Sequence, residues 1–452
     1  MAARKTSKRK APRASARPPA RPDAAGKAWL RWLKVRRFRH VEPCELHFTE
    51  GFNVLLGLNG TGKTTLLEIL AAALRSNFSH WRKEPFSFEY ELVTPGSVLR
   101  IAVENVEVTP GFNAERLGTT IRGEANWQPQ FELKLFSPEG RLRLNVRADV
   151  AGSDVTVDGQ AARWEFPRAG FLHGGPLVLM TWGGALQSGE DEIGELLVDA
   201  AGPWENTRRF DEALGFLQEL VGSSSSVEVY TYAGRAGAHA ISSGALGADM
   251  RHALIGALAG TSGPAPPTVT LDSDAVPVLK RIAELLDVAR VEARFSHLET
   301  KVQGADEVRR YGNPSFMLTR ADGSATSHEL LSYGQKRALS FLCYLDANPA
   351  TVVADELVDG LHHSWIEAAV AAIGKRQAFL ASQNPLLLDY LEFDSAAKVQ
   401  SSFIQCRLRR DEKGTDRMLW ANMSEYDAAR FFDAYQVGLQ HVSEILVTRG
   451  LW

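Results

Sequence analysis

Residues 53–67 read NVLLGLNGTGKTTLL, and this stretch decides the fold. The apolar run over 52–56 is typical of a buried strand, and the apolar positions over 64–74 recur with the period of a helix. A glycine-rich turn between a strand and a helix is the context in which the motif G-x-x-x-x-G-K-[ST] binds phosphate groups. That motif is completed here by Gly57, Gly62, Lys63 and Thr64.

The turn supplies the groups that a nucleotide phosphate needs. Glycines let backbone N–H groups close around the phosphates, and the helix that follows adds the positive end of its dipole. We expect Lys63 to reach the β- and γ-phosphates and the Thr64 hydroxyl to bind Mg²⁺. The sequence therefore predicts an ATP–Mg²⁺ site with the loop residues Gly57, Asn59, Gly60, Thr61, Gly62, Lys63, Thr64 and Thr65.

The other half of the site is predicted much later in the chain. The segment TVVADE, residues 351–356, is a mostly apolar run that ends in two adjacent acids. A buried strand of this kind exposes the acids at its carboxyl end, where open α/β sheets bind ligands. Asp355 is the expected Mg²⁺ ligand, and Glu356 is expected to orient and deprotonate the attacking water. The alternative is an acidic turn that caps the following helix.

Composition places the chain among ordinary globular proteins. Its 452 residues are 44% hydrophobic and 23% charged, with a net charge of −3, and they are enough for two subdomains. No run of about 18 apolar residues occurs, so we expect no membrane span. Cys44, Cys343 and Cys406 lie far apart and form no CxxC pair, which favours packing thiols in a reducing, cytoplasmic compartment.

Residues 1–27 differ from the rest of the chain in charge. They carry nine lysines and arginines against one acid, Asp23, so this tail is +8 and the remaining chain is −11. A segment rich in Ala, Pro and Arg cannot bury enough surface to offset its ordering entropy, and we expect it to be disordered. The basic tail is either an arm that contacts nucleic acid or a solubilising segment.

The folded part is predicted to be α/β and to divide into lobes. Residues 28–200 combine the phosphate-binding loop with alternating segments typical of an antiparallel sheet, and we call them lobe I. Residues 201–325 are assigned to a helical or inserted lobe, the insertion lobe. Residues 326–452 return to α/β texture and form lobe II, which contains the acidic strand. Helices are expected over 210–220, 274–295 and 424–446.

Four ordered segments resemble one family. LSYGQKR at 331–337 resembles the signature segment of ABC-type ATPases, and DELVDGLHH at 355–363 resembles the acidic strand and loop of their RecF, SMC and OLD-type branch. ASQNPLLLDYL at 381–391 is similar to the switch segment that follows, and LKVRRFRHVEPCELHF at 33–48 is similar to the first strands. The resemblance implies a P-loop α/β fold, an ABC-ATPase head with an antiparallel β lobe and a helical lobe.

The resemblance also implies a mechanism. In such ATPases two subunits sandwich two nucleotides, and the signature segment of one subunit completes the site of the other. Ser332, Gly334 and Gln335 would then contact the nucleotide of the partner subunit in a homodimer. Taken alone, the same segment also fits a Ser-capped helix in the core. Gln383 stands where the family has a switch histidine and would sense the γ-phosphate, and Gln187 is the candidate for a glutamine that contacts Mg²⁺.

The sequence is compatible with more than one biological function. The first hypothesis is a cytoplasmic ATPase of the RecF/SMC/OLD-like group, a nucleotide-driven dimer switch that acts on DNA or on an effector protein encoded elsewhere, in DNA repair or anti-phage defence. The alternatives are the ATPase subunit of a membrane transporter and a nucleotide-locked scaffold with little hydrolysis. The long interval between the phosphate-binding loop and the signature segment counts against the transporter.

Overall fold

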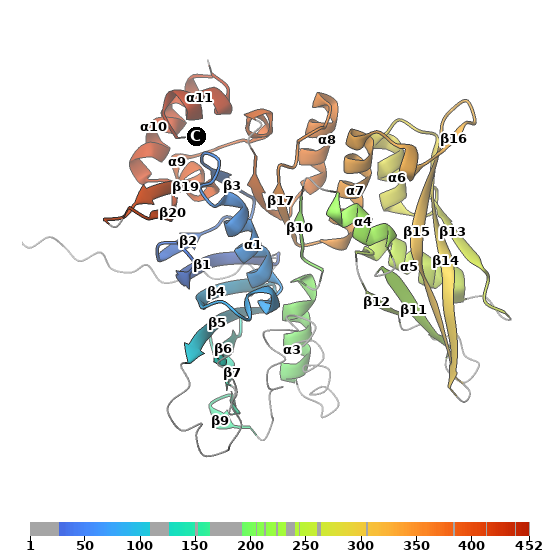
Figure 1. Cartoon of the computed structure of the whole chain (residues 1–452), viewed down its shortest axis with the longest axis horizontal. Helices are drawn as coiled ribbons and strands as arrows, with labels where there is room; N and C mark the ends of the chain where they lie inside the picture. The colour runs from blue at the N-terminus through green and yellow to red at the C-terminus, as the bar shows by residue number, and fades with distance from the viewer. Residues whose placement is uncertain are drawn as a thin grey trace, which may run out of the picture.

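Figure 1 shows the computed structural model of the chain. The basic tail up to residue 26, Gln187 and Gln383 lie outside the described residues, so what the sequence predicts for them stays a prediction. The structure describes residues 27–108, 126–149, 152–162, 192–204, 206–211, 214–222, 225–231, 240–243, 245–259, 264–303, 306–382, 385–412, 414–438 and 440–451.

A mixed sheet forms the centre of the molecule and takes strands from all three lobes (Figure 1). Its middle strands are parallel, with Ala354 level with Leu380 and Leu380 level with Val54. They are almost wholly buried, as expected for parallel strands covered on both faces. The strands in spatial order are β10 (Arg209–Phe210), β17 (Thr351–Asp355), β18 (Gln377–Ala381), β3 (Phe52–Leu56), β19 (Phe403–Arg410) and β20 (Asp416–Asn422).

An antiparallel sheet, as predicted for lobe I, extends away from this centre. An aromatic cluster fixes the loop after the first helix to it: the ring of Phe78 lies 5.5 Å from that of Phe86 and 5.7 Å from that of Phe88. The strands in spatial order are β2 (Cys44–His47), β1 (Trp29–Phe38), β4 (Phe86–Thr94), β5 (Ser97–Val108), β6 (Asn126–Phe136), β7 (Leu142–Ala148), β8 (Ser153–Val157) and β9 (Gln160–Ala161).

Gln377 links the antiparallel sheet to the central sheet. Its side chain is fully buried, accepts a hydrogen bond from Leu30 N–H at 2.8 Å, and donates to the carbonyl oxygens of Leu30 and Thr49, each at 2.8 Å. Leu30 belongs to β1 and Gln377 begins β18. A buried amide keeps all these hydrogen bonds in only one relative position of the two sheets, so this contact fixes how the sheets meet.

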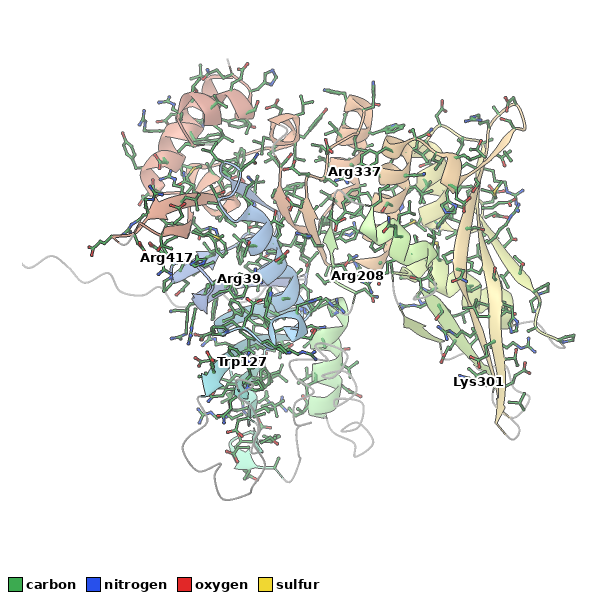
Figure 2. The ribbon with its side chains drawn as sticks, in the orientation of Figure 1. Arg39, Trp127, Arg208, Lys301, Arg337 and Arg417 are labelled. Carbon is green, nitrogen blue, oxygen red and sulfur yellow. The ribbon has the colours of Figure 1, made fainter. Side chains whose placement is uncertain are left out.

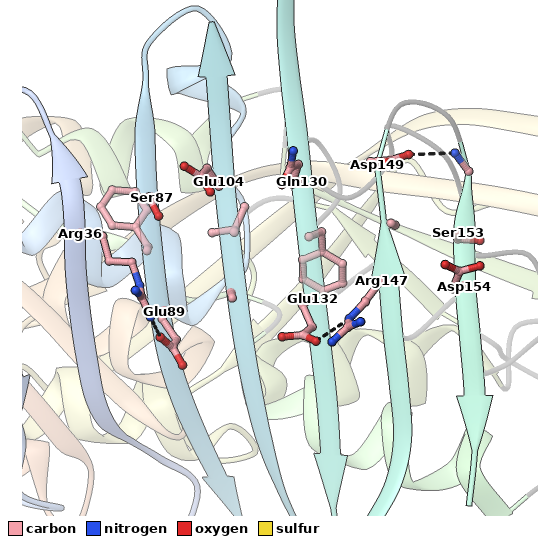
Figure 3. Close-up of a pocket in the computed structure, with 16 residues that line it drawn as sticks. Arg36, Ser87, Glu89, Glu104, Gln130, Glu132, Arg147, Asp149, Ser153 and Asp154 are labelled. Atoms are coloured by element: carbon pink, nitrogen blue, oxygen red, sulfur yellow. Dashed lines mark hydrogen bonds and ion pairs between the residues drawn. The ribbon is translucent and has the colours of Figure 1, made fainter. Parts of the chain in front are cut away.

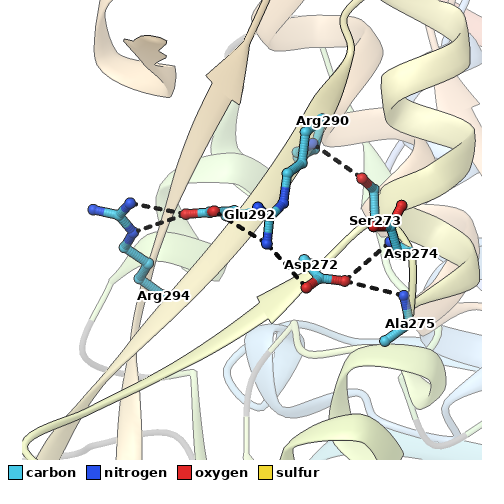
Figure 4. A network of polar contacts seen from close by, with 8 residues as sticks. Asp272, Ser273, Asp274, Ala275, Arg290, Glu292 and Arg294 are labelled. Atoms are coloured by element: carbon cyan, nitrogen blue, oxygen red, sulfur yellow. Dashed lines mark hydrogen bonds and ion pairs between the residues drawn. The ribbon is translucent and has the colours of Figure 1, made fainter. Parts of the chain in front are cut away.

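The insertion lobe contains helices packed on a second antiparallel sheet. Val291, Ala293 and Phe295 alternate toward the buried face of this sheet. The other face is charged: Arg294 donates to Glu292, and Arg290 donates to Asp272 (Figure 4). The strands in spatial order are β12 (Ala240–Ser243), β11 (Ser226–Thr231), β15 (Asp306–Thr319), β14 (Arg290–Gln303) and β13 (Thr268–Asp272), with β16 (Ala325–Ser327) beside β15.

Helices cover the faces of these sheets. The helix α7 is buried on almost every side from Arg337 onward and lies in the core that joins lobe II to the insertion lobe. The α-helices are α1 (Lys63–Leu74), α3 (Glu192–Ala201), α4 (Gly215–Val221), α5 (Ala248–Ala259), α6 (Pro277–Leu285), α7 (Tyr333–Ala347), α8 (His363–Ile373), α9 (Ala396–Ser402), α10 (Glu425–Val437) and α11 (Val442–Thr448). No described helix is long and apolar enough to cross a bilayer.

Two of the helices expected in the insertion lobe were predicted too long. The first was expected to begin at Phe210, but Phe210 belongs to β10 and α4 begins at Gly215. The second was expected over 274–295. It ends at Leu285 because Asp287 takes a left-handed conformation, with φ 52°, and the chain then enters β14. The helical periodicity of the sequence continues past the turn, but the residues after the turn pair as a strand.

The single C-terminal helix predicted over 424–446 is two helices. Gly438 has φ 70° and ends α10 in the left-handed conformation common after helices. His441 then caps α11, and its N–H donates to Glu444 Oε2 at 3.2 Å. The glycine was the signal for the break.

Candidate functional site

The loop between β3 and α1 follows a path that two glycines make possible. Gly57 has φ 151° and Gly62 has φ 86°, conformations that side-chain-bearing residues rarely adopt. A Cβ on Gly57 would collide with the carbonyl oxygen of Cys406, and a Cβ on Gly62 would lie 2.5 Å from Met418 Sδ. The glycines therefore let the loop turn and also let it rest directly on β19 and β20.

Lys63 lies inside this loop. Its Nζ donates to the carbonyl oxygens of Gly57 at 2.7 Å and Leu58 at 3.1 Å, and the residue is 7% exposed. Trp420 Nε1 donates to Thr61 O at 3.2 Å and braces the loop from β20. The ammonium group is thus held where the loop curves, the position from which it can reach a phosphate.

Thr64 and Asp355 meet although they come from distant parts of the chain. Only β18 separates β3 from β17, so the loop after β3 and the end of β17 share one edge of the sheet. Thr64 Oγ1 donates to Asp355 Oδ2 at 2.6 Å. A hydroxyl and a carboxylate side by side are oxygen donors of the kind that Mg²⁺ binds, with phosphate oxygens and water as its other ligands.

Glu356 follows the end of β17 in a conformation unusual for its type. Its φ is 47°, and it is 8% exposed. Its N–H donates to Ala381 O at 2.9 Å, and Ser382 Oγ lies 3.5 Å from Glu356 Oε2. Asp355 and Glu356 therefore follow one another at the strand end. They do not form the helix-capping turn that the sequence left as an alternative, since the N-cap position of α8 is His362.

Arg337, the last residue of the signature segment, is fully buried behind this strand end (Figure 2). Its guanidinium donates to the carbonyl oxygens of Glu356 and, at 3.3 Å, of Leu357. It also donates to Asp211 O at 2.9 Å and lies over the ring of Phe210, 5.0 Å from its centroid. One side chain of α7 thus holds the loop after β17 and the end of β10 together.

The start of the signature segment is a capped helix terminus at the surface. Ser332 Oγ accepts from Gln335 N–H at 3.3 Å, and Gln335 Oε1 accepts from Ser332 N–H at 3.0 Å. The Ser cap foreseen in the alternative is therefore formed, but at the surface and not in the core. Gly334 packs closely on the neighbouring loop, because a Cβ there would lie 2.7 Å from Gly360 O. Ser332 and Tyr333 are exposed, so capping leaves the segment open to a partner.

Comparison with known proteins agrees with this geometry. A family described as AAA domain matches residues 33–121, which include the phosphate-binding loop. The DNA replication and repair protein RecF of Vibrio vulnificus is 28% identical over 200 residues, 42% of this chain and 51% of the relative. RecF of Vibrio atlanticus is 31% identical over 162 residues, 33% of this chain and 41% of the relative. The chain is thus similar to an AAA domain over residues 33–121 and to RecF over 42% of its length or less, a likeness that supports the RecF/SMC branch of ABC-class ATPases. It spans about half the length, or less, of the curated relatives it matches.

Solved SMC head domains also overlap much of the chain. The SMC head bound to the C-terminal winged-helix domain of ScpA covers 87% of this chain at 12% identity, with a TM-score of 0.37. The SMC head domain of Thermotoga maritima covers 87% at 12% identity, with a TM-score of 0.33.

Sequence reasoning missed two residues beside the acidic strand end of this candidate site. Arg209 Nη1 lies 3.8 Å from Asp355 Oδ2 and 3.6 Å from Glu68 Oε1. Asp211 follows β10, whose Phe210 is level with Ala354, so it lies next to the end of β17. The strand β10 has two residues and too little sequence for a periodic pattern. It adds Arg209 and Asp211 to the edge of the site, whereas Gln187, the Mg²⁺ contact that the sequence had offered, lies outside the described ranges.

One large hollow of the described chain lies elsewhere. It measures about 900 Å³ and lies on the polar face of the antiparallel sheet of lobe I, between β1 and β8 (Figure 3). Paired charges such as Arg36 with Glu89 and Arg147 with Glu132 line it. None of the residues of the phosphate-binding loop, the acidic strand or the signature segment belongs to its lining. This hollow is therefore separate from the candidate site at the edge of the central sheet.

The three cysteines are free thiols. Burial raises the pKa of Cys44 to about 11 and that of Cys406 to about 12, and it also raises the pKa of Cys343. All three therefore stay protonated near neutral pH, which fits packing residues better than reactive thiols.

Proposed function

We propose that this chain binds and hydrolyses ATP with Mg²⁺ and that the nucleotide drives a homodimer switch that acts on DNA or on a partner effector. The 2.6 Å contact between Thr64 Oγ1 and Asp355 Oδ2 carries the proposal. It joins the phosphate-binding loop to the acidic strand, and both are needed for phosphoryl transfer to water in P-loop proteins.

The nucleotide would be bound by groups that are already in place. Lys63 and the backbone N–H groups of residues 57–65 would hold the phosphates, and Thr64 and Asp355 would hold Mg²⁺. When bound, the ion neutralises charge on the β- and γ-phosphate oxygens. This pair of oxygen donors fits Mg²⁺, because the ion usually takes only one or two protein ligands beside phosphate oxygens and water.

Glu356 would act on water. Its carboxylate would accept a proton as the water oxygen attacks the γ-phosphorus, and ADP would leave with the bridging oxygen. Ser382 Oγ, 3.5 Å from Glu356 Oε2, would help to orient that carboxylate. Gln383, the next residue, would sense the γ-phosphate, as the resemblance to the switch segment suggests.

The partner proposals have separate support. The exposed, capped start of α7 supports a dimer in which Ser332, Gly334 and Gln335 meet the nucleotide of the other subunit, because its N–H groups suit an anion. The RecF relatives are named for DNA replication and repair, and the basic tail supports DNA as a ligand. Free thiols support a reducing compartment such as the cytoplasm.

The test of this function is nucleotide binding followed by turnover. Isothermal titration calorimetry should show Mg²⁺-dependent ATP binding by the full chain, and a phosphate-release assay should show hydrolysis. Lys63→Ala should lose binding, because it removes the cation held at the loop. Thr64→Ala should keep weak binding but lose its dependence on Mg²⁺. ATP binding that is unchanged in Lys63→Ala would place the nucleotide elsewhere and refute the site.

A further inference from the structure

Two adjoining cavities lie beside the end of α1 and share three arginines. They measure about 500 Å³ and about 480 Å³. Arg75 caps the C-terminal end of α1, Arg208 immediately precedes β10, and Arg209 begins it. Each of the three lines both cavities. Three guanidinium groups from two elements therefore border one space (Figure 2 labels Arg208).

The acidic groups of the walls already have cationic partners. The ion pairs join Arg39 with Glu84, Arg208 with Glu219, and Arg209 with Glu68 and Asp211. Arg75 differs. Its Nε is buried without a hydrogen-bond partner, and no ion pair or hydrogen bond of the described chain engages its guanidinium. Arg75 is thus the arginine of the cavity wall without a direct acidic partner among the described residues, although the two linings together hold four arginines and four carboxylates.

Arg208 lacks an acceptor for one of its donors, although Glu219 pairs with one of its terminal nitrogens. Its Nε is also buried without a hydrogen-bond partner among the described residues. Burial, and then the like charge of Arg75, lower the pKa of Arg208 to about 10. A cation at the C-terminal end of a helix is favourable, which accounts for an arginine at position 75. It does not account for a second arginine beside it with donors left over, an arrangement that costs free energy unless an anion satisfies both.

We infer that the space between Arg75, Arg208 and Arg209 binds a phosphate group. Guanidinium forks match phosphate oxygens in bidentate fashion, and bonds between two charged groups are the strong ones. The cavities are larger than one phosphate, so the group would belong to a larger ligand. Its source is either the phosphodiester backbone of a nucleic acid or a free phosphorylated small molecule.

Arg209 connects this phosphate site to the nucleotide site. Its Nη1 lies 3.8 Å from Asp355 Oδ2 and has no hydrogen-bond partner among the described residues. A phosphate in the cavity would attract Arg209 away from Asp355 and leave that carboxylate freer for Mg²⁺. This consequence rests on the proposed function, whereas the phosphate site itself does not.

The experiment uses the full chain carrying Lys63→Ala, which removes the loop cation and so weakens the binding of inorganic phosphate at the phosphate-binding loop. Calorimetric titration with inorganic phosphate should then show saturable binding. Adding Arg75→Ala should weaken it by about 10-fold or more, the scale for losing a charged hydrogen bond. The matched control is Arg82→Ala, an exposed arginine that lines neither cavity and should leave binding unchanged. Should Arg75→Ala fail to fold, as judged by circular dichroism, Arg75→Lys keeps the charge without the fork and should still bind several-fold more weakly.

A second titration distinguishes the sources. Phosphate binding that is suppressed by a bound DNA duplex identifies the nucleic-acid backbone, and phosphate binding that persists beside bound DNA identifies a free phosphorylated ligand. Equal phosphate affinity in the Arg75 and Arg82 variants overturns the inference, and so does the absence of saturable binding in the Lys63→Ala chain. Because that chain lacks the loop cation, failure of the nucleotide proposal does not affect either result.

Discussion

At the scale of single residues, Glu356 shows how a local conformation is held against its cost. A left-handed φ in a residue other than glycine costs about 1–3 kcal/mol, and such positions persist where their surroundings fix them. Here both flanking peptide groups are fixed: the N–H donates to Ala381 O, and the carbonyl accepts from Arg337. The conformation places the Glu356 carboxylate beside Asp355 at the strand end. The proposed hydrolysis requires the carboxylate at that position.

We predict that Glu356→Gln keeps ATP binding, lowers turnover by about 100-fold or more and accumulates an ATP-bound dimer, because the amide keeps the shape of the carboxylate but cannot accept the proton. Light scattering with ATP measures the dimer, and phosphate release measures turnover. Lys63→Ala in the same chain is the control, since it should prevent the dimer. A Glu356→Gln chain that stays monomeric with ATP would count against the sandwich.

At the scale of elements, α7 is the helix that joins the signature segment to the acidic strand. Its first turn lies at the surface, and one turn later Arg337 reaches the carbonyl oxygens of Glu356, Leu357 and Asp211. A shift of the exposed turn on contact with a partner would therefore move the loop that carries Glu356. The same helix contacts the insertion lobe through Asp346 near its other end.

Arg337→Lys should keep ATP affinity within a few-fold and lower turnover by about 10-fold, because one ammonium group cannot bridge three carbonyl oxygens as the planar guanidinium does. Calorimetry and phosphate release separate the two effects. The neighbouring Lys336→Ala is the matched control and should behave like the parent. Equal turnover in the two variants would mean that the contact serves stability alone.

The contact of α7 with α5 should depend on pH through Asp346. Burial raises the pKa of Asp346 to about 6 from its ordinary 3.8. Its Oδ1 accepts from Asp249 N–H at 2.9 Å, and its Oδ2 has no hydrogen-bond partner among the described residues. Between these two pH values the folded state binds the proton more tightly than the unfolded state does, so stability from this group falls as pH rises and is lost above about 6.

We therefore predict that Asp346→Asn, which keeps an oxygen for Asp249 N–H and cannot ionise, gains stability relative to the parent as pH rises from 4 to 7. The full change is on the order of 1–3 kcal/mol. Thermal unfolding midpoints of the two chains across that range measure it, and the difference between them cancels the titration of other groups. Parallel curves would show that folding does not raise the pKa of Asp346.

At the scale of the whole molecule, charge is divided unevenly. The tail over 1–27 is +8 and the rest of the chain is −11. Nine cations near one end can release several counterions from a nucleic acid when they contact its phosphates. The acidic remainder of the chain repels those phosphates. Lys27 already belongs to the folded part, where it donates to Lys375 O.

Deleting residues 1–26 should weaken DNA binding and make it less sensitive to salt, because eight of the nine cations are removed while the folded chain from Lys27 onward stays intact. Fluorescence anisotropy with a labelled duplex at several salt concentrations measures affinity and slope together. A variant with those eight residues changed to glutamine keeps the length of the tail and should behave like the deletion. An unchanged slope would leave the tail without a nucleic-acid role.

The sequence by itself determined the parts of the site that are local. An apolar run, glycines at fixed spacing, and Lys63 with Thr64 specify a strand, a turn and a helix start within a few residues of one another, so the phosphate-binding loop is readable without the fold. Asp355 and Glu356 are readable for the same reason, since a buried strand exposes whatever follows it. The break in 424–446 was also local, at Gly438, although the longer helical pattern hid it.

Only the tertiary structure decided the rest. The neighbours of Asp355 come from β10, a two-residue strand without any pattern of its own, and their position follows from pairing with β17 far along the chain. The buried position of Arg337 depends on the same neighbours, and nothing in its sequence context distinguishes it from a surface arginine. The end of α6 was set by strand pairing of β14 with β13 and β15. In each case the stabilising free energy comes from contacts between segments that are distant in the chain. Local periodicity carries no information about such contacts.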